Sequence, residues 1–148
     1  MKIIIETPPQ DAEDEIIIRC HELDEEVMSL IYALKQGRTR ITAYSGKTIL
    51  QLSPKDIYYF ESVDNKVFAY CEKEVYEVKE KLYEIETIYS KTDFQRISKS
   101  VIVNISRIES VAPTLGARLE ANLQNGERVI ISRQYVPNLK KKLGIAER

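Results

Sequence analysis

The stretch from Phe94 to Asn104, FQRISKSVIVN, combines side chains that bind phosphate with a strand that can hold them in place. Arg96, Ser98 and Lys99 come directly before an apolar run. Arginine and lysine neutralise the phosphates of nucleic acids, and residues at the end of a buried strand have a fixed position. The stretch therefore predicts a phosphate-binding surface, although an ordinary charged surface loop can have the same pattern.

Further basic or amide side chains lie at the expected ends of strands or on the last helix. They are Asn65 and Lys66, Arg118, Arg133 and Gln134, and Lys140, Lys141 and Lys142. If the strands form one packed unit, several of these sets converge on one edge. Arginine, asparagine and glutamine also make two-point contacts to guanine or adenine edges. The lysine triplet equally suits the C-terminal dipole of a helix.

Apolar periodicity predicts a mostly β domain after about residue 40. The expected strands are 41–44, 48–52, 56–62, 67–71, 74–78, 101–103, 117–123 and 128–132, with residues 105–111 beginning as a turn. The expected helices are 78–89 and 136–143. Ser45-Gly46, Asp64-Asn65 and residues 124–127, which contain Asn-Gly, mark hairpin turns.

Residues 1–40 predict a small β-β-α extension, with strands at 3–5 and 15–20 and a helix at 24–36. Asp24 suits the N-cap, and Gly37 suits the end of the helix. The helix has one apolar stripe: Val27, Leu30, Ile31 and Leu34. Because this piece is small for a core of its own, the stripe must be buried against the main domain, a partner or a second copy. We therefore predict a homodimer or a regulatory protein partner.

The formal net charge of −1 over 148 residues hides an asymmetry. Residues 1–36 hold three basic and nine acidic side chains, a charge of −6. The remaining residues hold 19 basic and 14 acidic side chains, a charge of +5. Such an asymmetry hints at a polyanion-binding part beside an acidic part, and its modest size adds little weight.

Several other classes of protein find no support in the sequence. The N-terminus turns acidic too soon for a signal peptide, and no apolar run is long enough for a membrane span. Cys20 and Cys71 lie in apolar, strand-like runs, which favours buried free thiols and a cytoplasmic protein, with a disulfide left open.

Catalytic and cofactor motifs are also lacking. His21 is the single histidine, no Cys-x-x-Cys pair occurs, and the five glycines are too scattered for a phosphate loop. We therefore predict no enzyme, no metal, no cofactor and no small-molecule substrate. A helix-turn-helix pattern is missing as well, so any nucleic acid would be bound by loops and strand ends.

From about residue 41 to residue 144 the chain resembles a LytTR (LytR/AlgR-type) DNA-binding domain. The matching pieces occur in the family order: DIYYFES at 56–62, VYEVKEKLYEIE at 75–86, FQRISKSVIVNISRI at 94–108, NLQNGERVIISRQYV at 122–136 and LKKKL at 139–143. The resemblance implies a mostly β (α+β) fold of short antiparallel sheets with a few short helices, in a domain spanning residues 41–148. It further implies a transcription regulator that binds promoter repeats in double-stranded DNA, as a dimer, through loops in the major groove.

By this resemblance the DNA-binding residues are Asn65, Lys66, Arg96, Ser98, Lys99, Arg118, Arg133 and Gln134. We assign phosphate contacts to Lys66, Arg96, Lys99 and Arg118, and base-edge contacts to Asn65, Arg133 and Gln134. Ser98 and Lys99 stand where the family often has His-Arg, so an imidazole and a guanidinium fork are missing there. Ser100 and Asn104 also match, and Asn104 suits a structural role at a turn.

Many family members begin with a receiver domain of roughly 120 residues, for which the 40 residues before the match are too few. The resemblance thus implies a stand-alone regulator. One alternative is a protein-interaction module with weak or lost DNA binding. A second is a single-strand RNA binder whose aromatic residues stack on bases, namely Tyr58, Tyr59, Phe60, Phe68 and Tyr70. Their alternation along the strands suits a core at least as well.

Overall fold

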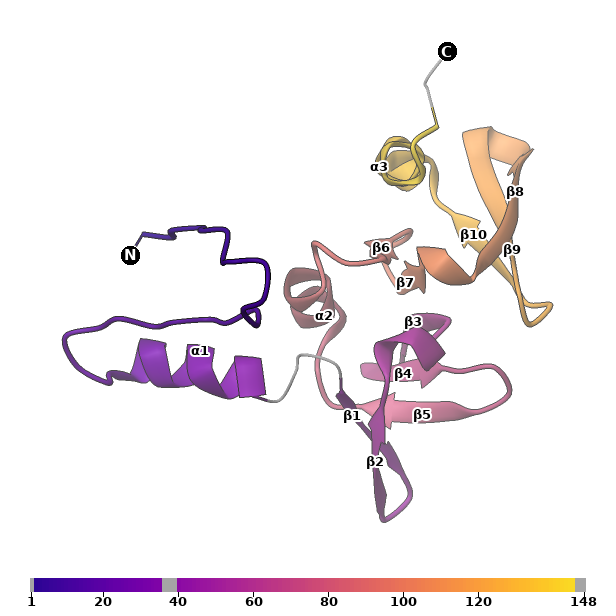
Figure 1. Ribbon diagram of the computed structural model, residues 1–148. Helices are drawn as coiled ribbons and strands as arrows, with labels where there is room; N and C mark the ends of the chain where they lie inside the picture. The colour runs from indigo at the N-terminus through magenta and orange to yellow at the C-terminus, as the bar shows by residue number, and fades with distance from the viewer. Residues whose placement is uncertain (1, 36–39, 146–148) are drawn as a thin grey trace. The chain divides into compact units, whose positions relative to one another are not determined.

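The computed structural model describes residues 2–35 and 40–145, in two units that comprise residues 1–38 and 39–148. The second unit is built from two antiparallel sheets with short helices (Figure 1). This confirms the predicted mostly β fold of short sheets.

The larger sheet has the strand order β2-β1-β5-β4-β3-β7-β6. Its strands are β1 (Ile41–Ser45), β2 (Thr48–Leu52), β3 (Tyr59–Val63), β4 (Lys66–Tyr70), β5 (Val75–Val78), β6 (Phe94–Arg96) and β7 (Val101–Asn104). Two predicted hairpins, β1-β2 and β3-β4, are confirmed. In the second hairpin Asp64 and Asn65 have φ angles of 51° and 64°. This left-handed pair is the conformation of a tight two-residue hairpin turn.

The smaller sheet has the order β10-β9-β8 and lies near the last helix, α3 (Figure 1). Its elements are β8 (Ile108–Thr114), β9 (Arg118–Leu123) and β10 (Arg128–Ile131), followed by α3 (Val136–Leu143). The Asn-Gly hairpin is confirmed, and Gly126 has a φ of 91°, which residues other than glycine rarely adopt. The bounds predicted for the last helix are confirmed as well.

Strand β7 contributes to two cores because successive side chains of a strand point to opposite faces. Ile102 packs in the first core with Phe60 and with Leu82 and Ile85 of α2 (Leu82–Ile88). Val103, the next residue, packs in a second core. That core also contains Tyr58, Ile97, Leu119, Ala121, Leu123, Val129, Ile131 and Leu139. The loop before β7 is therefore attached to a strand that is buried on both faces.

Asn104, at the end of β7, has the structural role predicted for it. Its side chain is only 2% exposed. Nδ2 donates to the carbonyl of Ile57 at 2.8 Å, and Oδ1 accepts from the amide and hydroxyl of Ser106. The side chain thus supplies partners for backbone groups at a buried strand end.

Helix α2 begins later than predicted. Val78, Leu82, Ile85 and Tyr89 show helical spacing, and the first three are buried in the first core. Val78, however, is the last residue of β5 and pairs with Val67 of β4. The sequence assigns Val78 both to the strand predicted at 74–78 and to the helix predicted at 78–89. Sheet pairing confirms the strand for this residue, and the helix prediction is wrong at its start.

The predicted N-terminal strands are wrong, so the first unit is not a β-β-α piece. Residues 3–5 and 15–20 are not strands, and α1 (Glu25–Lys35) is the regular element that the structure describes there. Asp24 caps α1 by accepting from the amide of Val27 at 2.9 Å, as predicted. The predicted helix end at Gly37 lies outside the described residues. An isolated pair of short strands has too few partners to be stable, which explains the difference.

The two cysteines are both free, as predicted. Cys71 is half-buried, whereas Cys20 is exposed, so the prediction that both thiols are buried is wrong. Cys20 was expected to lie on a strand, and that strand is not formed.

Candidate nucleic-acid interface

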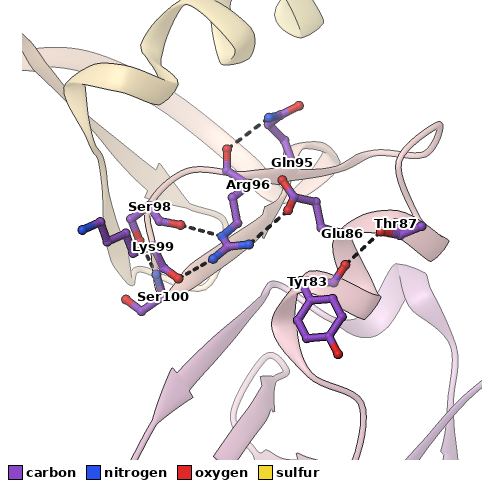
Figure 2. Close-up of polar contacts among 8 residues, drawn as sticks. All are labelled: Tyr83, Glu86, Thr87, Gln95, Arg96, Ser98, Lys99 and Ser100. Atoms are coloured by element: carbon purple, nitrogen blue, oxygen red, sulfur yellow. Dashed lines mark hydrogen bonds and ion pairs between the residues drawn. The ribbon is translucent and has the colours of Figure 1, made fainter. Parts of the chain in front are cut away.

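The loop between β6 and β7 presents Lys99 on a well-supported backbone. Ile97 is fully buried, and the hydroxyl of Ser98 accepts from the amide of Ser100 at 3.2 Å. Arg96 donates to the carbonyls of Ser98 and Lys99. The Lys99 side chain is exposed and extends away from Arg96 (Figure 2). The charge that was predicted to contact phosphate is therefore available to solvent.

The segment after β10 lies against this loop, although the two are more than thirty residues apart in sequence. The amide of Ser132 donates to the carbonyl of Ile97 at 2.8 Å. A depression of about 410 Å³ lies between the two segments. It is lined by Ser98, Lys99, Ser100, Ser132, Arg133 and Gln134. Two sets predicted separately from the sequence thus form one surface.

The charges on this surface face solvent. Lys99, Arg133 and Gln134 are exposed. In the part of the chain that the structure describes, neither Lys99 nor Arg133 takes part in an ion pair. An anion that enters the depression would meet two cations without having to displace a carboxylate.

The β3-β4 hairpin brings Asn65 and Lys66 to the same end of the larger sheet. The amide of Ser62 donates to the carbonyl of Ser100 at 2.8 Å, which joins β3 to the β6-β7 loop. Pairing of Glu61 with Val101 places the turn of the hairpin beyond the start of β7. Asn65 and Lys66 are exposed at this turn.

Arg118 lies at the corresponding end of the smaller sheet. Leu119 of β9 pairs with Ile131 of β10. Arg118, the residue before Leu119, therefore lies at the end of β9 where Ser132 follows β10. Arg118 is exposed, but its Nε already donates to the carbonyl of Leu115 at 2.9 Å. It does not line the depression. Its position suits a contact at the margin of the surface.

Arg96 is placed differently from the other predicted residues. Its side chain is only 15% exposed. Besides its two bonds to loop carbonyls, Nη1 contacts Oε1 of Glu86 on α2 at 3.1 Å (Figure 2). Three of the five guanidinium N–H groups are bonded within the protein, and the burial of the side chain limits the access of a DNA phosphate to the other two.

The three lysines of α3 also differ in whether they are bonded within the protein or exposed. Nζ of Lys142 donates to the carbonyl of Phe94 at 2.9 Å, and burial lowers the pKa of Lys142 while Asp93 opposes that shift. Lys142 therefore attaches α3 to β6. Lys141 is exposed and Lys140 is half-buried.

Sequence reasoning did not choose Ser100 and Ser132 as contact residues, yet both line the depression. Their positions in the sequence could have indicated this, because Ser100 follows Lys99 and Ser132 precedes Arg133 in the same loops. Their hydroxyl groups can donate to phosphate oxygens and can therefore support the cations beside them.

The aromatic residues do not form an open stacking platform. Tyr58 and Phe60 are buried, and Phe68 is half-buried. The half-buried rings of Tyr59 and Tyr70 stack on each other, with centroids 4.3 Å apart. Burial, followed by the nearby carboxylates, raises the pKa of both phenols. These rings are covered or stacked on each other, and carboxylates lie beside them. They therefore do not offer RNA bases an open surface for stacking, and the single-strand RNA alternative loses its support.

Within residues 2–35 and 40–145, no cluster of three or more histidine, cysteine or acidic side chains has a metal-binding arrangement. His21 is exposed. No helix in this part of the chain is long and apolar enough to cross a membrane. The depression itself is lined by basic, amide and hydroxyl side chains.

Comparison with known proteins agrees with this geometry. The family model of the LytTr DNA-binding domain matches residues 47–144, and both loops of the depression lie within the match. The chain belongs to the LytTR family. LytTR is a family of DNA-binding domains, and the prediction of such a domain in this chain is confirmed.

Relatives of two kinds share the LytTR domain. The sensory transduction protein LytT of Enterococcus faecalis is 31% identical over 98 residues, which is 66% of this chain and 40% of that protein. The LytT protein of Bacillus subtilis is 28% identical over 109 residues, or 74% of this chain and 45% of its own length. The chain therefore spans less than half the length of these relatives. An uncharacterised HTH-type transcriptional regulator of Staphylococcus aureus is 28% identical over 148 residues, 98% of this chain and 99% of its own.

A solved structure supports the same fold. The LytTr DNA-binding domain of a protein described as a methyl-accepting/DNA response regulator, from Bacillus cereus, aligns with a TM-score of 0.68. It is 27% identical and covers 72% of this chain and 98% of its own. The LytTR-like arrangement of short antiparallel sheets is thus confirmed.

Proposed function

We propose that this LytTR protein is a sequence-specific regulator that binds promoter repeats in double-stranded DNA within the cytoplasm. Two loops, residues 98–100 and 132–134, enter the major groove together. The observation that carries this proposal is the depression lined by both loops, where Lys99 and Arg133 are exposed and form no ion pair with any residue that the structure describes. Side chains on two adjoining loops can contact base edges and flanking phosphates at the same time.

The exposed residues divide by chemistry into two roles. Lys66, Lys99 and Arg118 contact phosphates, because their charges lie around the depression or at the same sheet ends. Asn65, Arg133 and Gln134 contact base edges, because amides and guanidinium groups can make two hydrogen bonds to one base. Ser98 supports its loop through its hydroxyl.

Two copies of the chain bind the two repeats of a site. The support lies in residues 2–23, which are acidic and therefore unsuited to DNA, yet expose large apolar side chains. These are Ile3, Ile4, Ile5, Ile16, Ile17 and Leu23. Burial of such groups between two copies would be favourable.

The test is a mobility shift with the purified chain and the promoter region of its own gene, against random competitor DNA and over a range of salt concentrations. We expect binding that resists competitor, with a steep loss of affinity as salt increases. Binding that is no tighter than to random DNA would contradict the proposal.

The second candidate is a protein-interaction module with weak DNA binding, which the same exposed isoleucines favour. A variant lacking residues 1–38 separates the two. The DNA-binding proposal expects the shortened chain to bind a single half-site unchanged and to lose its preference for a double site. The alternative expects no specific DNA binding in either form.

A further inference from the structure

We propose that Arg96 is a positioning residue, which holds the β6-β7 loop in its DNA-binding conformation and is itself held by Glu86 of α2. This inference rests on the proposed function, and it replaces the phosphate contact that the sequence predicted for Arg96. Figure 2 shows the contacts of Arg96 with the loop and with Glu86 that support it.

The carbonyl groups of residues 97–100 all accept hydrogen bonds from the protein. The carbonyl of Ile97 accepts from Ser132, and that of Ser100 accepts from Ser62. The two carbonyls between them accept from Arg96, through Nε at 2.7 Å for Ser98 and through Nη2 for Lys99. Arg96 thus provides the contacts at the tip of the loop, where no strand partner is present.

This arrangement has an electrostatic consequence for DNA binding. A carbonyl oxygen carries partial negative charge and would repel a phosphate that approached the tip. Because Arg96 binds both oxygens from inside the loop, Lys99 can extend outward without such a neighbour. The planar guanidinium presents its donors in a fixed fork, whereas an ammonium concentrates its donors on one nitrogen.

Glu86 completes the support from the helix side. Its carboxylate contacts Nη1 of Arg96 at 3.1 Å, and it is 47% exposed while Arg96 is 15% exposed. A pair this exposed adds little to the stability of the fold. Its effect is geometric, because it fixes the edge of the guanidinium opposite the loop. The net charge of the pair is zero, so Arg96 adds little to attraction of DNA over long distances.

The test uses Arg96→Lys, which keeps the charge and removes the fork. In the free protein, we expect the amides of Ser98 and Ser100 to exchange with solvent about tenfold faster or more, because the bonds that order the tip are lost. Amides of Phe60 and Ile102 should keep their exchange rates, which shows that the fold is intact.

In DNA binding, the same variant should weaken specific binding by about tenfold, a change of about 1.4 kcal/mol, with an unchanged salt dependence. Glu86→Gln should change both measurements in the same direction by a smaller factor. The matched control is Arg128→Lys, which alters an arginine that is paired with Glu120 on the smaller sheet. We expect the control to resemble the unmodified chain.

Two outcomes would overturn the inference. If Arg96→Lys keeps slow loop exchange and full affinity, the charge is sufficient and the fork positions nothing. If loop exchange rises but specific binding is unchanged, the loop conformation does not matter for DNA. Lys99→Ala and Arg133→Ala then identify the failing step: losses of affinity in these variants leave the proposed function standing, and unchanged affinity contradicts it as well.

Discussion

The amide of Ser132 donates a 2.8 Å hydrogen bond to the carbonyl of Ile97, and this bond joins the two loops that line the depression. Ile97 is fully buried, so the acceptor has a fixed position within the second core. Lys99 in the β6-β7 loop of the larger sheet and Arg133 after β10 of the smaller sheet consequently reach the same surface.

Arg133→Ala should weaken specific binding by about 1–3 kcal/mol and relax the sequence preference, because a two-point contact to a base is lost. Binding to operator and random DNA, compared at one salt concentration, measures the change. The control is Arg128→Ala, since Arg128 is exposed at the other end of β10. Equal losses on both DNAs would remove Arg133 from the base-contacting set.

Lys99→Ala should weaken operator and random DNA similarly, because a phosphate contact carries no sequence information. The slope of log affinity against log salt should become shallower by about 0.9, the contribution of one neutralised phosphate. Lys73 is exposed between β4 and β5, away from the β3-β4 turn, so Lys73→Ala is the control. An unchanged slope of log affinity against log salt would contradict the phosphate contact proposed for Lys99.

Asn104→Ala should lower the free energy of unfolding by about 2–4 kcal/mol, because the carbonyl of Ile57 and the amide of Ser106 lose a buried partner. Denaturant unfolding measures the loss. Asn122→Ala removes an exposed bond to Ser110 and serves as the control, with a loss of about 0.5 kcal/mol or less. A loss for Asn104→Ala no larger than this would contradict its structural role.

The two thiols should react at very different rates. Burial, followed by the charges of Asp56 and Glu74, raises the pKa of Cys71 to about 11. At pH 8 only about one in a thousand of these thiols is ionised, and this fraction increases as the pH rises towards 11. We expect iodoacetamide to modify the exposed Cys20 first, as mass spectrometry of the peptides would show.

The Cys20→Ser variant isolates the slow site. In this variant, modification at pH 8 should be slow and should accelerate about tenfold for each pH unit up to about 10. Rapid modification of Cys71 at neutral pH would show that its thiol is neither buried nor near the two carboxylates.

The elements of the second unit were largely predictable because their signals are local. The Asn-Gly turn and the alternating apolar residues beside it predicted the β9-β10 hairpin, and the Asp64-Asn65 turn predicted β3-β4. Val78 shows the limit of such signals. Its spacing fits the helix predicted at 78–89 as well as the strand predicted at 74–78, and pairing with Val67 places it in β5. Pairing with a distant strand is not visible in a window of neighbouring residues.

The N-terminal unit shows a second limit. Apolar runs at 3–5 and 15–20 have the composition of strands, but the structure forms none there. A strand is stable only when another strand supplies its hydrogen bonds, and local composition does not say whether such a partner is present.

The sequence by itself determined the resemblance to a LytTR domain, through motifs such as FQRISKSVIVNISRI, and which loops carry charge, because these patterns lie within short stretches of chain. Only the tertiary structure decided where each charge lies and which protein groups it contacts. Lys99 and Arg133 share a surface because packing joined two distant loops, and Arg96 turned inward because unpaired loop carbonyls and Glu86 lie within its reach. The partners of a long side chain depend on what folding brings near it, and residue type alone leaves them open.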